Sequence, residues 1–309
     1  MRLCFFIVVS IFIFYSCSNE TKEVKTVKVS RPQDLEKETV KQLNSYLLKD
    51  SIITVDSIPL TCYRYFNPQY NSKLLWFDKS KLNPNGDSLL KLIEKSMYYG
   101  LIPNNYHFIN IQRQLDSIET NKTTINVTAL VSADLLLSDA YFLMGAHLNK
   151  GRFYTDSLLL QTNFHKLDKG WDSVLVSAYK KNNLKAGLDS LEPKFYNYRM
   201  LKKELATILN DPILYQVDSI PFVTEKDTIV KLQLIKKSLI KQGLYDSTIM
   251  ANDSIKLAKA LNKLQKKWFI QPDGKIGKYT TQAFSYNREK IIKQICMAME
   301  RWRCEANFP

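Results

Sequence analysis

Residues 254–284 read SIKLAKALNKLQKKWFIQPDGKIGKYTTQAF, and this stretch decides how the C-terminal part of the chain folds. Large apolar residues recur along it at spacings of four, three and four: Leu257, Leu261, Leu264 and Trp268. This spacing places them on one face of a helix, which either Asn252 or Asp253 can cap. An earlier helix over residues 228–242 carries apolar residues at i, i+3 and i+7, and Gly243 is its stop signal.

A turn cluster follows the long helix and must reverse the chain before a short closing helix from Thr280. Its members are Asp273, Gly274, Ile276 and Gly277, with Pro272 and Lys275 among them. Glycine is expected there because it alone tolerates a left-handed backbone, and Ile276 is expected to plug the helix core. We therefore predict a compact three-helix module over residues 228–287.

The order of these features resembles the peptidoglycan-binding-like domains of bacterial cell-wall enzymes. The matching residues are Gly243-Leu244-Tyr245, a Leu-x-x-x-Leu-x-x-Leu-Gln pattern, and Pro272-Asp273-Gly274-x-Ile276-Gly277-x-x-Thr280. The resemblance implies peptidoglycan as a partner. Aromatic faces stack on sugar rings and lysines pair with carboxylates, so the candidate ligand contacts are Tyr245, Trp268, Lys275 and Tyr279. For Trp268 the alternative is buried packing, because it completes the apolar face of the helix.

The N-terminus has the form of an export signal. Arg2 is followed by a largely apolar run, Leu3 to Tyr15, and then by Ser16-Cys17-Ser18. The run is too short to span a bilayer as a permanent helix. The position of Cys17 resembles a bacterial lipoprotein signal, in which that cysteine becomes the lipidated first residue. The alternative is an ordinary signal peptide with Cys17 as a bystander.

We therefore predict a signal peptide over residues 1–16, lipidation at Cys17, and a cell-envelope protein that faces the periplasm and contacts the membrane through its lipid anchor. The formal net charge of +14 indicates an anionic partner. With an export signal present, that charge does not favour nucleic acid. If Cys17 is lipidated, Cys62, Cys296 and Cys304 remain. The last two lie about 12 Å apart along a helix, beyond the reach of a disulfide, so free thiols are expected.

The chain between the anchor and the module divides into three parts. Residues 17–45 are predicted to be a polar tether, residues 46–214 a helical domain, and residues 215–227 a linker or an edge strand. In the helical domain we predict a strand at 52–55 and a helix capped by Asp87. Further predicted helices cover 105–118, 128–148, 171–181 and 193–209, and Gly151 is the stop signal of the helix at 128–148.

Several motifs of this domain are similar to the scaffold region of the large murein L,D-transpeptidases. They are Trp76-Phe77, Tyr99-Gly100-Leu101-Ile102-Pro103-x-x-Tyr106, Asp134-Leu135-Leu136-Leu137-Ser138-Asp139-Ala140 and Asn149-Lys150-Gly151-Arg152. Near the C-terminus, Ala298-Met299-Glu300-Arg301-Trp302-Arg303 resembles the helix that leads into the family's catalytic domain. Residues 288–309 are thus expected to form a helix leading to a catalytic domain that this chain lacks.

The catalytic string of that family, Ser-His-Gly-Cys, does not occur in the sequence. A nucleophilic thiolate needs a neighbouring base and backbone donors, and none of the three histidines stands beside a cysteine. His147 is expected at the surface or partly buried, and Asp134 and Asp139 on a solvated face or as caps. We predict no catalytic residue, no metal site and no cofactor.

Together these observations predict a mainly α protein, a helical scaffold domain followed by a three-helix peptidoglycan-binding-like domain. The leading hypothesis is an envelope lipoprotein that is bound to or positioned on peptidoglycan and has no active site of its own. One alternative is the N-terminal part of a functional L,D-transpeptidase that crosslinks murein stem peptides. The other is a protein-interaction scaffold in the envelope.

Overall fold

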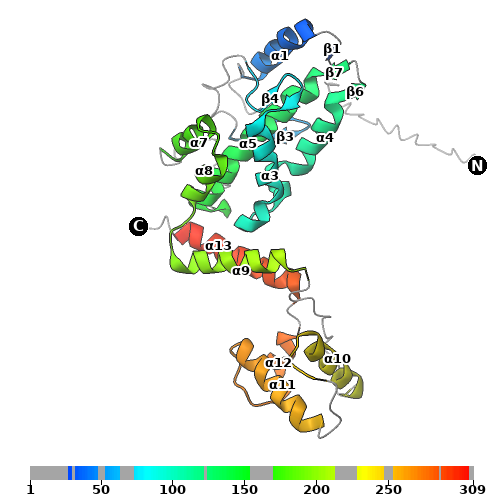
Figure 1. Cartoon of the computed structure of the whole chain (residues 1–309). Helices are drawn as coiled ribbons and strands as arrows, with labels where there is room; N and C mark the ends of the chain where they lie inside the picture. The colour runs from blue at the N-terminus through cyan, green and yellow to red at the C-terminus, as the bar shows by residue number, and fades with distance from the viewer. Residues whose placement is uncertain are drawn as a thin grey trace, which may run out of the picture.

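The computed structural model describes residues 27–29, 32–47, 53–62, 73–121, 124–153, 170–212, 228–246, 253–284 and 287–305. The predicted signal peptide, Cys17 and the linker at 215–227 lie outside the described residues. The described part is mainly helical, as predicted, with small antiparallel sheets (Figure 1). The sheets are β1 (Lys28–Val29), β7 (Thr124–Asn126) and β6 (Glu119–Asn121) in that order, β2 (Thr54–Val55) with β3 (Ile58–Pro59), and β4 (Phe77–Asp78) with β5 (Lys81–Leu82).

Helix α5 (Val127–Lys150) is the centre of the larger body. The Asn126 side chain accepts a hydrogen bond from Ala129 N at 3.1 Å and caps its start, and Gly151 caps its end. The helix is apolar on nearly every side, because other elements surround it. By length and composition it would suit a membrane span, but 89% of that apolar window is buried in the protein, which is typical of a core helix.

Among the described α-helices that pack on α5, five lie before residue 192 of the chain (Figure 1). They are α1 (Pro32–Leu47), α3 (Pro84–Glu94), α4 (Phe108–Ile118), α7 (Trp171–Lys180) and α8 (Leu184–Leu191). The prediction of a polar tether over residues 17–45 is wrong for its C-terminal part, because α1 packs Leu35 and Leu43 into the main core. Helix α8 was not predicted from the sequence.

The polar residues of α5 are also more buried than the sequence indicated. Asp134 accepts hydrogen bonds from the backbone N–H groups of Leu75 at 3.0 Å and Trp76 at 2.8 Å. Asp139 accepts from Cys62 N and lies 2.8 Å from His107 Nε2. A solvated face was the wrong expectation, because these carboxylates fasten three loops to the core helix.

Two further local expectations are corrected. His147 is buried, with its Nδ1 2.9 Å from the Tyr106 hydroxyl, rather than at the surface or partly buried. Helix α3 is capped by Asn83, whose side chain accepts from Gly86 N at 2.9 Å. Asp87 instead lies in the first turn and pairs with Lys91.

Helices α9 (Tyr196–Asn210) and α13 (Arg288–Glu305) lie side by side below the main core (Figure 1). They share an apolar cluster made of Tyr198, Leu205, Ile208, Ile291, Ile295 and Met299. Arg303 is fully buried at the end of α13 and donates to the Tyr99 carbonyl and, at 3.1 Å, to the Tyr198 hydroxyl. Helix α13 therefore packs back onto the scaffold.

The three module helices are α10 (Thr228–Lys241), α11 (Asp253–Lys267) and α12 (Lys278–Ala283). They enclose a separate core of Ile235, Leu239, Leu257, Ala260, Leu261, Leu264, Ala283 and Phe284. Figure 1 shows them beyond the ends of α9 and α13. Because α9 and α13 pack together, the module is an insertion between two helices of the scaffold.

Candidate functional site

The turn of the module is organised by one buried amide side chain on α11, that of Gln265. Its Nε2 donates to Asp273 Oδ1 at 2.7 Å, to Thr280 Oγ1 at 2.9 Å and to the Lys275 carbonyl at 3.1 Å. Its Oε1 accepts from Gly274 N at 2.9 Å. One side chain of 1% exposure thus holds both limbs of the reversal. The sequence pattern included this glutamine but gave no reason for it.

Gly274 has a φ of +68°, and a Cβ placed there would lie 3.2 Å from both the Ala258 carbonyl oxygen and the Ala258 Cβ. This residue therefore combines a left-handed backbone with close packing on α11. Gly277 has a φ of −97° and begins α12 in an extended conformation. The expected left-handed backbone is thus wrong for Gly277. Ile276 is half-buried and packs against the module core.

The Asp273 carboxylate has a lowered pKa. The main cause is the hydrogen bond from Lys275 N at 2.9 Å, followed by the bond from Gln265, and the charge of Lys275 acts in the same direction. The hydrogen bonds of the turn therefore stabilise the ionised form of Asp273.

The four predicted ligand residues fall into two groups. Tyr245 and Trp268 are half-buried and pack against the module core, and Trp268 also packs against the cluster shared by α9 and α13. Lys275 is exposed, and Tyr279 is 68% exposed. Only Lys275 and Tyr279 therefore offer most of their side chain to a ligand.

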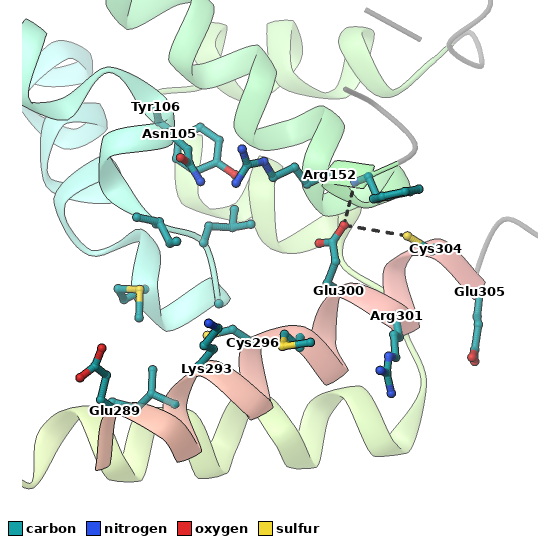
Figure 2. Close-up of a pocket in the computed structure, with 17 residues that line it drawn as sticks. Asn105, Tyr106, Arg152, Glu289, Lys293, Cys296, Glu300, Arg301, Cys304 and Glu305 are labelled. Atoms are coloured by element: carbon teal, nitrogen blue, oxygen red, sulfur yellow. Dashed lines mark hydrogen bonds between the residues drawn. The ribbon is translucent and has the colours of Figure 1, made fainter. Parts of the chain in front are cut away.

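A groove of about 1220 Å³ lies elsewhere, between α13 and the scaffold (Figure 2). Its other wall is formed by the turn that holds η2 (Ser96–Tyr99) and η3 (Pro103–Tyr106), and by Arg152 and Phe153, which follow the end of α5. Residues of α13 from Glu289 to Glu305 line it, which is about 24 Å of helix. Its apolar lining includes Met97, Leu101, Ile102, Ile292 and Met297. The groove depends on the docking of α13, so no local sequence pattern indicates it.

Glu300 and Cys304 are the polar groups of the groove whose contacts with its walls are clearest. Glu300 accepts from Phe153 N and from Arg303 Nη1, each at 3.1 Å, and Cys304 Sγ lies 3.9 Å from it. Figure 2 shows Arg152 directed across the groove towards Tyr106. Burial raises the pKa of Cys296. A thiol with a raised pKa is a poor nucleophile at neutral pH, so Cys296 does not have the features of a nucleophilic cysteine.

The described residues contain no group of three His, Cys, Asp or Glu side chains placed to hold a metal ion. Cys62, Cys296 and Cys304 are free thiols.

Comparison with known proteins places the larger body in a class. A protein-family model described as a scaffold domain matches residues 64–205, and it is the scaffold domain of L,D-transpeptidases. The matched stretch runs from before β4 into α9 and includes the whole of α5. No curated protein matches the chain. Residues 64–205 are thus similar to the scaffold domain of L,D-transpeptidases, and the predicted resemblance is confirmed for this part.

Proposed function

We propose that this protein is a cell-envelope lipoprotein that is positioned on peptidoglycan, with the scaffold domain as its body and the inserted three-helix module as its wall-binding part. The scaffold match is the observation that carries the proposal, because L,D-transpeptidases act on the wall polymer. The module adds support through its sequence resemblance to peptidoglycan-binding-like domains. The export signal and Cys17 supply the anchor.

The charge of the chain also fits an anionic wall polymer. Lysines at 259, 263, 266 and 275 are exposed on α11 and on the turn that follows it. Stem-peptide carboxylates would be attracted to such a surface within a Debye length of about 8 to 10 Å. This attraction concentrates the protein on the wall, and specific contacts must supply the remaining affinity.

The test is sedimentation with purified sacculi. The intact chain is compared with a variant in which residues 213–286 are replaced by a short Gly-Ser linker. The intact chain is expected to sediment with sacculi and the variant to stay in solution. Equal sedimentation of the two, or none of either, would refute the wall-binding role of the module.

A second candidate is that the chain serves as the non-catalytic part of an L,D-transpeptidase. The observation that favours it is α13, which carries the sequence resembling the helix before the catalytic domain and is docked on the scaffold through Arg303. Translation of the DNA beyond the codon of Pro309 in all frames tests it. A Ser-His-Gly-Cys string there would favour this candidate, and its absence in every frame would exclude a catalytic domain encoded downstream.

A further inference from the structure

Phe269 has the most unusual combination of conformation and exposure among the described residues of the module. Its side chain is 100% exposed, and its φ is +54°. It lies two residues after Lys267, the last residue of α11, at the position where a left-handed residue commonly ends a helix. The Ile270 N–H donates to the Gln265 carbonyl at 2.8 Å, which is the hydrogen bond that such an ending makes.

This position favours glycine or asparagine and disfavours a bulky side chain, because Cβ approaches the following carbonyl oxygen in the left-handed region. A fully exposed ring also gains nothing from burial. Phe269 therefore costs conformational energy in the folded chain and has no packing gain to offset it. A residue that adopts an unfavourable backbone conformation and gains no packing in exchange is a candidate for a role in binding.

The residues on either side hold Phe269 in place. Trp268 packs against the module core and against the cluster of α9 and α13, and Ile270 packs against the module core. The two neighbours fix the backbone at Phe269, so only the torsions of one short side chain need to be ordered when the ring binds. An aromatic side chain has two χ angles, and its ordering therefore costs little entropy.

The surroundings indicate the chemistry of the ligand. Lys266 and Lys267 precede Trp268, and Gln271, Pro272 and Asp273 follow Ile270, and all five are exposed. A protein partner or an acyl chain needs a broad apolar patch, whereas this ring stands in a polar and basic setting. A pyranose ring has one apolar C–H face edged by hydroxyl groups, and it matches a single aromatic face of this kind.

We propose that Phe269 is a stacking platform for a sugar ring of the glycan strand, with the neighbouring lysines facing its acidic substituents. This inference rests on the proposed function, and it assigns wall binding to the C-terminal end of α11. Tyr279, on α12, is the other strongly exposed aromatic side chain of the described module.

The decisive variant is Phe269→Gly in the full chain. Glycine suits the left-handed backbone, so the thermal unfolding midpoint of the module is expected to equal or exceed that of the wild type. Binding to sacculi is expected to fall at least about fivefold, because the stacking face is lost. Phe269→Trp should keep binding near the wild-type level. Ile255→Ala, which removes another exposed apolar side chain from α11, is the matched control and should bind as the wild type does.

A second probe separates sugar from peptide. Glycan strands freed of stem peptides by amidase should still bind the wild-type chain and should bind the Phe269→Gly variant at least about fivefold more weakly. If the wild type binds intact sacculi but not these strands, or if Phe269→Gly binds as the wild type does, the stacking proposal is overturned and the proposed function stands. If the wild type does not bind sacculi, the proposed function itself fails.

Discussion

At the scale of single residues, Gln265 is the side chain on which the module turn depends. Replacement by leucine removes the hydrogen bonds of both amide atoms and leaves the Gly274 N–H and the Lys275 carbonyl without this partner. We expect Gln265→Leu to destabilise the module by about 2 kcal/mol, because polar groups next to the core then lose their bonding partner. Hydrogen exchange of peptides from residues 253–284 measures this loss of stability. Lys263→Leu, on an exposed position of the same helix, is the control, and equal protection in both variants would contradict the role of Gln265.

Asp273 predicts how the same turn responds to acid. Its pKa is lowered in the folded chain by the hydrogen bonds from Lys275 N and Gln265. The stabilisation is therefore complete above the unfolded pKa of about 3.9 and is lost as the pH falls through the lower folded value. We expect protection of the turn amides to decrease below about pH 4. Asp273→Asn should flatten this dependence, and an unchanged acid profile in that variant would assign the effect to other groups.

Of these residues, only some could be predicted from the sequence. Gly274 could be predicted, because a turn cluster with glycine favours a left-handed backbone. The role of Gln265 could not be predicted, because a glutamine next to the apolar face of a helix is equally consistent with a solvated position. Phe269 was not singled out, since its left-handed backbone follows from where α11 ends, and helix ends are the least certain part of a sequence prediction.

At the scale of elements, α13 is held by a buried arginine. Arg303 donates to the Tyr99 carbonyl and the Tyr198 hydroxyl and pairs with Glu300, and so joins α13 to η2 and α9. We expect Arg303→Leu to weaken the docking of α13 by about 3 kcal/mol, because charged hydrogen bonds are lost and buried acceptors remain. Faster hydrogen exchange over 288–305 is the measurement.

Arg301→Leu is the matched control for this prediction, because Arg301 is exposed on the same helix. If Arg303→Leu and Arg301→Leu exchange at the same rate over α13, apolar packing alone holds the helix and the arginine is dispensable.

Periodicity predicted most helices but not their surroundings. The apolar spacing gave α5 nearly to its bounds, yet its carboxylates were misplaced, because burial on all sides is set by the helices packed around it. The polar composition of residues 17–45 predicts a tether. Leu35, Thr39 and Leu43 recur every four residues there, and all three are buried in α1. A helical stripe was thus present in a polar stretch, and the average composition concealed it.

At the scale of the whole molecule, the sequence gives the order of the parts but not their connection. The scaffold, the module and the helix at 288–305 follow one another along the chain. This order favours an arrangement in which they also follow one another in space. The structure instead brings α13 back to α9, so the scaffold is closed by a helix that comes after the module. This pairing is a contact between residues far apart in sequence, and no local pattern contains it.

The insertion predicts that the scaffold folds without the module. Arg288 Nη2 donates to the Ile208 carbonyl at 2.6 Å, so the end of α9 and the start of α13 are adjacent, and a linker of about six residues can join them. We expect a chain with residues 213–286 replaced by such a linker to be folded and monodisperse. Its unfolding midpoint should fall by no more than about 4 °C, which reflects the lost contact of Trp268 with the shared cluster.

A chain that ends at Pro212 is the informative comparison, because it lacks α13 as well as the module. It leaves Tyr198, Leu205 and Ile208 without their apolar partners and the Tyr99 carbonyl without Arg303. It should unfold far below the linker variant, or aggregate, when both are followed by circular dichroism and size-exclusion chromatography. If instead the linker variant aggregates and the shorter chain is well folded, α13 is not part of the scaffold in solution.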